Sequence, residues 1–108
     1  MPQETTLFYN VSIQEYQQPS KVIVDKYCNG VTVVNIGATN MRINGIPLAP
    51  PVAPQLIGES YTFGGNRNEI FYGRLDIGFT GGTGNCLVIQ KYYIPFQKKP
   101  FELEQEKV

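Results

Sequence analysis

Short apolar runs separated by turn residues recur along the chain and predict β-strands. In "LFYNVSI" apolar and polar positions alternate, with Leu7, Tyr9, Val11 and Ile13 on one face, while β-branched residues dominate "KVIVDKYC" and "VTVVNI". No segment has the periodicity of a helix longer than about one turn. We expect strands at residues 7–13, 21–28, 31–36, 41–43, 46–48, 59–63, 69–79 and 86–96.

The segments between these strands carry turn and loop signals. Asn29-Gly30 and Asn44-Gly45 are typical of tight turns, and the second would close a very small hairpin. Residues 49–58, "APPVAPQLIG", predict an extended surface loop with polyproline character. Residues 80–85, "TGGTGN", match no phosphate-binding pattern and precede a strand, so they predict a connection between strands.

Regularly spaced short strands favour an all-β fold. We expect a single antiparallel β-sandwich or jelly-roll-like domain of about seven or eight strands with extended terminal arms. The expected divisions are an N-terminal arm with the first strand at 1–20, the β-sandwich domain at 21–96 and a charged C-terminal tail at 97–108.

Charge is balanced overall but unevenly distributed. Nine Lys and Arg offset nine Asp and Glu, so the chain lacks the basic field that direct nucleic-acid binding requires. Residues 20–94 hold only ten charged side chains, which suggests that neighbouring subunits cover part of the surface. Because neither a signal-like N-terminus nor a long apolar run is present, we expect no ordinary export signal and no membrane insertion.

Side chains for catalysis and metal binding are sparse. The chain has no His, so we expect no zinc site, no cofactor and no enzymatic activity. Cys28 and Cys86 form either a cross-sheet disulfide or two buried free thiols, and the missing signal favours free thiols. Nothing in the spacing of the acids of the central region requires two of them to converge as in a glycosidase: Asp25, Glu59, Glu69 and Asp76.

Seven Tyr and six Phe exceed what a core of this size needs. Tyr92 and Tyr93 are consecutive in a predicted strand and so point to opposite faces. Cross-strand aromatic pairs that stabilise the sheet account for more than half of these residues. The remainder favour a protein–protein interface ahead of a sugar site, because aromatic residues are enriched at interface cores. The candidate interface residues are Pro50, Pro51, Pro54, Tyr92, Tyr93 and Phe101, and a possible ligand loop contains Asn66, Arg67 and Asn68.

One segment carries a resemblance to a known group of proteins. "VTVVNIGATNMRINGIPLAP" followed by "GESYTFGGNRNEI", with N-x-G-x-T-N, R-I-N-G-I-P-L-A-P and G-E-S-Y, resembles small virion-associated proteins of tailed bacteriophages, including phages of Bacteroidetes hosts. The resemblance spans about residues 31–93. This chain departs from the pattern because residues 51–57 separate "LAP" from "GES", which normally abut.

The resemblance implies a non-enzymatic virion component, either a capsid decoration or head-fibre protein or a part of the neck or tail. The implied partners are other virion proteins and further copies of the chain, and the implied location is the virion, assembled in the host cytoplasm. A carbohydrate-binding module or a host-attachment module of a phage tail stays open as an alternative.

Overall fold

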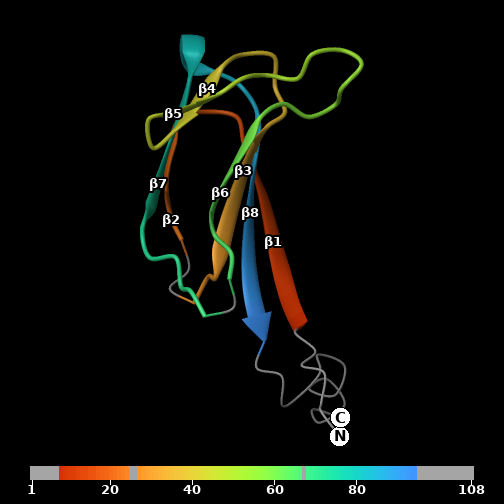
Figure 1. Ribbon diagram of the computed structural model, residues 1–108. Coiled ribbons are helices and arrows are strands. Elements are labelled where there is room, and N and C mark those ends of the chain that lie inside the picture. The colour runs from red at the N-terminus through yellow and green to blue at the C-terminus, as the bar shows by residue number, and fades with distance from the viewer. Residues whose placement is uncertain (1–7, 25–26, 67, 95–108) are drawn as a thin grey trace, which may run out of the picture.

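The computed structural model describes residues 8–24, 27–66 and 68–94, and within them eight strands and one short 3-10 turn (Figure 1). The turn η1 covers Thr80–Gly82. The strands are β1 (Phe8–Tyr16), β2 (Ser20–Ile23), β3 (Gly30–Asn35), β4 (Met41–Ile43), β5 (Ile46–Leu48), β6 (Ser60–Gly64), β7 (Arg74–Phe79) and β8 (Cys86–Ile94).

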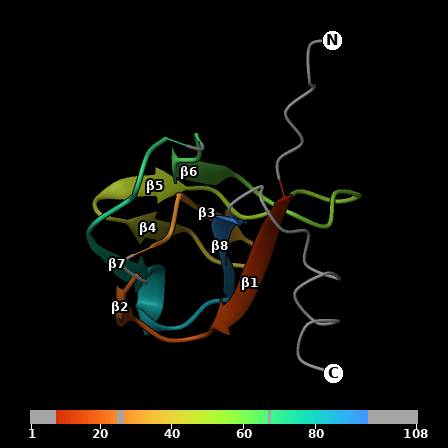
Figure 2. The same ribbon diagram turned by 90° about the horizontal axis from the view of Figure 1, so that it is seen from below.

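The strands form two four-stranded antiparallel sheets that pack face to face. Sheet A has the order β1-β8-β3-β6, and sheet B has the order β2-β7-β4-β5. Figure 2, which looks along the strands, shows the two layers as arcs that face each other. The expected all-β antiparallel sandwich is therefore confirmed.

The core consists of the inward residues of both sheets. Sheet A supplies Val31, Val33, Cys86 and Val88, and sheet B supplies a larger aliphatic set. That set contains Val22, Met41, Ile43, Leu48, Leu75 and Ile77. Inward and outward positions alternate along β4 and β7, as the two-residue period of a half-buried strand requires.

The Asn44-Gly45 turn is confirmed, and it closes the hairpin between β4 and β5. Asn44 has a φ of 50° and Gly45 a φ of 84°, the left-handed pair that a tight hairpin turn needs. The Asn44 side chain also holds the hairpin against β7, because its Oδ1 accepts a hydrogen bond from the Asp76 backbone N–H at 2.6 Å. The glycine-rich residues 80–85 connect β7 to β8, as expected.

The prediction of a tight turn at Asn29-Gly30 is wrong. Here the chain crosses from sheet B to sheet A, so β2 and β3 do not pair. Asn29 is buried, and its side-chain amide forms hydrogen bonds to two other segments of the chain. Its Nδ2 donates to the Glu69 carbonyl at 2.8 Å, and its Oδ1 accepts from the Tyr93 backbone N–H at 2.7 Å.

Strand lengths differ from the sequence predictions at three places. β1 continues to Tyr16 because it pairs with β8 through all nine residues. β2 ends at Ile23, where the crossover begins. Residues 69–73 precede β7 as a loop, since the Phe71 N–H bonds to the Cys28 carbonyl at 2.8 Å and the ring packs on the core.

Candidate interaction surface

The two cysteines lie on the inside of the sandwich and offer no reactive site. Both thiols are buried and neither forms a disulfide, so the prediction of buried thiols rather than a cross-sheet disulfide is confirmed. The pKa of the Cys86 thiol is raised to about 11, mainly by burial, against a lowering by a backbone hydrogen bond at Tyr16 and with a small further contribution from the nearby Glu15 carboxylate. A thiol with such a pKa is protonated at neutral pH and is a poor nucleophile.

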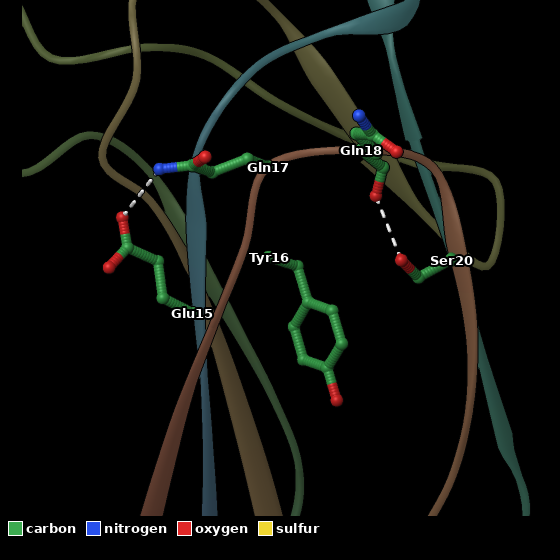
Figure 3. A pocket seen from close by; sticks show the side chains of 5 residues that line it. All are labelled: Glu15, Tyr16, Gln17, Gln18 and Ser20. Atoms are coloured by element: carbon green, nitrogen blue, oxygen red, sulfur yellow. Dashed lines mark hydrogen bonds between the residues drawn. The ribbon is translucent and has the colours of Figure 1, made fainter.

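A hollow of about 380 Å³ lies at the connection between β1 and β2, and all of its lining residues come from one short segment of the chain. Its residues are near neighbours in sequence: Glu15, Tyr16, Gln17, Gln18 and Ser20. Figure 3 shows Tyr16 pointing between the strands while the Glu15 and Gln17 side chains lie to one side, joined by a 3.4 Å hydrogen bond. The Ser20 hydroxyl donates its hydrogen bond to the Gln18 carbonyl at 2.9 Å.

The candidate acids that the structure describes lie on separate elements. Glu59 caps the base of the 49–58 loop, Glu69 accepts a long hydrogen bond from the Asn66 N–H, and Asp76 is exposed on β7. Asp25 lies outside the described residues. Within the described ranges, no group of three or more His, Cys, Asp or Glu could hold a metal ion, and no helix is long and apolar enough to cross a membrane.

The outer face of sheet A, which points away from sheet B, is unusually apolar. Tyr9, Val11 and Ile13 of β1 are 53%, 45% and 61% exposed. Their partners across the β1–β8 ladder lie on the same face and are half-buried: Tyr93, Lys91 and Ile89. We call this the outer apolar face and define it by Tyr9, Val11, Ile13, Leu87, Ile89 and Tyr93.

Two charged residues of the β1–β8 pair lie on the same side as this face, Lys91 on β8 and Glu15 on β1. The Lys91 ammonium lies 4.5 Å from the centre of the Tyr9 ring and 5.0 Å from that of Tyr93, and the two rings meet edge to face. Glu15 pairs with Leu87, four residues further along β1 than the Lys91 partner Val11. Four residues of strand span about 13 Å, so the two charges are not partners within one chain.

The proline-rich loop at 49–58 forms a second exposed apolar feature. Both views show it projecting on the outer side of sheet A (Figures 1 and 2). Its base is closed by two bonds between Ala49 and Glu59, of 3.0 and 2.8 Å. Its tip carries Leu56, 87% exposed, together with exposed Val52 and Ile57. The loop therefore presents apolar side chains from a fixed base, as a contact loop would.

The structure separates the predicted interface residues into different environments. Tyr92 packs on the core and Tyr93 lies on the outer apolar face, so their predicted opposite orientation is confirmed. Pro50 and Pro51 are half-buried at the base of the loop, whereas Pro54, which follows a cis peptide bond, is exposed. Phe101 lies outside the described residues.

The predicted ligand loop is only partly described. Asn66 and Asn68 are exposed, and Arg67 lies outside the described residues. A hollow of about 270 Å³ is lined by residues at and after the end of β2 and by residues 72–74: Ile23, Val24, Tyr72, Gly73 and Arg74. Neither asparagine lines that hollow.

Sequence reasoning missed most of the outer apolar face. The alternation in residues 7–13 placed Tyr9, Val11 and Ile13 on one face, but it could not tell whether that face is turned inward or outward. A usable signal lay in the other face of β1, because Asn10, Ser12 and Gln14 are polar and exposed as well. A strand exposed on both faces belongs at a sheet edge.

Comparison with protein-family models, with curated proteins and with solved structures finds no match for this chain. The resemblance of residues 31–93 to phage virion proteins therefore stays a prediction.

Proposed function

We propose that the protein is a non-enzymatic structural component that acts through protein–protein contacts. The observation that carries this proposal is the outer apolar face, on which three large side chains of β1 are half exposed or nearly so. Contiguous apolar patches of this kind on soluble domains mark surfaces that another molecule covers. The rigid base of the 49–58 loop beside that face adds a second contact element.

We further propose that its setting is a bacteriophage virion, where the partners would be capsid, neck or tail proteins and other copies of the chain. This part rests on the resemblance of residues 31–93 alone. In such a setting, the chain would be incorporated during assembly in the host cytoplasm as a decoration or head-fibre protein.

Purified particles from the phage that encodes the chain provide the test. Mass spectrometry should detect the protein in the particle, and cross-linking should join residues of the outer apolar face or the 49–58 loop to a structural protein. Particles that lack the protein, or cross-links only to sheet B, would contradict the proposal.

A glycine variant tests the loop separately. Replacing Pro50, Pro51 and Pro54 together with Gly should weaken incorporation while the fold is retained, because glycine loosens the backbone that the prolines restrict. Pro47→Gly on β5 is the control, since this exposed proline lies on sheet B. Unchanged incorporation of the triple variant would remove the loop from the contact.

A carbohydrate-binding or host-attachment module is the second candidate. The supporting observation is Tyr72, whose strongly exposed ring lies beside Arg74 in the hollow of about 270 Å³. An exposed aromatic ring can stack on the apolar face of a sugar, and a neighbouring guanidinium can donate hydrogen bonds to its hydroxyl groups. Binding of the isolated domain on a glycan array, abolished by Tyr72→Ala, would favour this candidate.

A further inference from the structure

β1 is an open sheet edge that is unusually exposed for a soluble domain. It pairs with β8 on one side through all nine of its residues. In the described part of the chain, no other strand pairs with its second side. Soluble proteins normally blunt such an edge with proline, bulges or charge, whereas β1 contains no proline and one charged residue, Glu15.

We propose that this edge pairs with the β1 edge of a second copy, in antiparallel orientation about a two-fold axis, so that two sheets A join into one eight-stranded sheet. The inference rests on the proposed function in part, because it identifies a second copy as one contact partner. A C2 interface uses the same patch on both subunits, and an antiparallel edge satisfies this requirement directly.

The sequence of β1 selects one register. Residues paired across an antiparallel edge share a face, so a two-fold axis must pass through a residue paired with itself. Ser12 is the middle of the nine residues Phe8–Tyr16, and only an axis at Ser12 pairs the whole strand without overhang. On the polar face this register places Asn10 opposite Gln14 of the second copy, and on the apolar face Val11 opposite Ile13 of the second copy.

Charge complementarity supports the same register independently. It places Glu15 of the second copy directly opposite Tyr9, and the Lys91 ammonium already lies 4.5 Å above the Tyr9 ring. Directly paired side chains have Cβ atoms about 5 Å apart, so carboxylate and ammonium come within reach. The two charges are separated within one chain, and the second copy brings them together at two symmetric positions.

Reciprocal charge reversal tests the register. Sedimentation equilibrium at low salt should show a dimer, and Glu15→Lys or Lys91→Glu should each raise its Kd roughly tenfold, since attraction at both positions becomes repulsion. The double variant should recover to within about threefold of the original, because the pair is restored in reversed order. The matched control reverses Lys21 and Asp76, which pair across β2 and β7 on sheet B, and should leave Kd unchanged.

Amide exchange gives a second readout. In the dimer, every second N–H of β1 gains a hydrogen bond at the edge, so its exchange should slow as protein concentration rises, while β5, one of the two outer strands of sheet B, should not change. A chain that stays monomeric at about 1 mM would overturn the inference, as would a double variant no tighter than the single ones. If the monomeric chain still enters particles through the outer apolar face, the proposed function stands and only the dimer fails.

Discussion

The outer faces of the two sheets differ although both cover the same core. The outer face of sheet B carries Lys21, Arg42, Arg74 and Asp76, an ordinary solvated surface. On β1 and β8 the outer face of sheet A has Tyr, Val, Leu and Ile at the corresponding alternate positions, with one lysine and one glutamate, while β3 and β6 add Thr32, Ser60 and Thr62. A sandwich needs apolar residues only on its inner faces. Under the proposed function, the second apolar face serves a contact outside the fold, and variants of matched residues on the two sheets can test this directly.

The largest expected effect is the difference in the free energy of unfolding between a substitution on an inner face and one on an outer face. Ile77 on β7 is 1% exposed, and Ile77→Ala should lower the free energy of unfolding by about 2–5 kcal/mol through lost burial and a cavity. Ile23→Ala, on the same sheet but 83% exposed, should change it by less than about 0.5 kcal/mol. Urea unfolding of dilute protein measures both. Similar losses for the two variants would mean that the inner and outer faces are wrongly assigned.

The second prediction compares the two outer faces. Ile13→Lys introduces a charge at the centre of the outer apolar face and should weaken self-association roughly ten- to hundredfold. Ile23→Lys places the same charge on sheet B and should have no effect on association. Because both isoleucines are well exposed, neither variant should lose the fold. Sedimentation measures association, and circular dichroism checks folding. Equal weakening by both variants would contradict a contact confined to sheet A.

The third prediction concerns the base of the 49–58 loop. A Cβ on Gly58 would overlap the backbone of Ala49, Pro50 and Pro51, and the bonds between Ala49 and Glu59 prevent that backbone from moving aside. Gly58→Ala should therefore cost about 1–3 kcal/mol and displace the loop. Gly78→Ala on sheet B meets no atom within 4 Å and serves as the control. Thermal unfolding of both variants decides the matter, and a Gly58→Ala protein as stable as the control would mean that the loop base is not rigid.

Local sequence patterns predicted the strands because strand and turn formation depends largely on neighbouring residues. β4 and β5 match the expected 41–43 and 46–48, since Asn44-Gly45 can close a two-residue turn by its own backbone preferences. Asn29-Gly30 has the same local chemistry, yet it fails because the buried Asn29 amide bonds to Glu69 and Tyr93, which are 40 and 64 residues away. Which sheet a strand joins depends on such distant partners.

The candidate surface was predictable only in part for a similar reason. The alternation of apolar and polar residues in β1 is visible in the sequence. Whether the apolar side chains point inward or outward depends on the register of β1 with β8 and on the width of sheet B. Proline content identified the 49–58 loop, because proline excludes a central strand on its own. The exposed Leu56 at its tip carries no sequence signal that distinguishes it from a core leucine.

The last prediction tests whether the Cys86 side chain, on the inner face of sheet A, is shielded from solvent. Burial raises the Cys86 pKa from 9.0 to about 11, so the folded chain holds this proton more tightly than the unfolded chain does. The resulting stabilisation is fully present below about pH 9 and is lost as the pH rises from 9 to 11. At pH 8 the thiolate population is about a hundredfold below that of an unshifted thiol, and alkylation of Cys86 should be slowed at least as much in the folded protein.

Peptide-resolved mass spectrometry after a timed iodoacetamide pulse measures that rate, and the urea-unfolded chain gives the unshifted reference. Cys86→Ala should remove the part of the stability loss between pH 9 and 11 that the thiol causes, because alanine has no proton to release. Rapid alkylation of the folded chain at pH 8 would mean that β1 and β8 open where Tyr16 pairs with Cys86. An edge that opens there could not hold the full nine-residue register about Ser12, so a slow rate is also a condition for the two-fold pairing of β1.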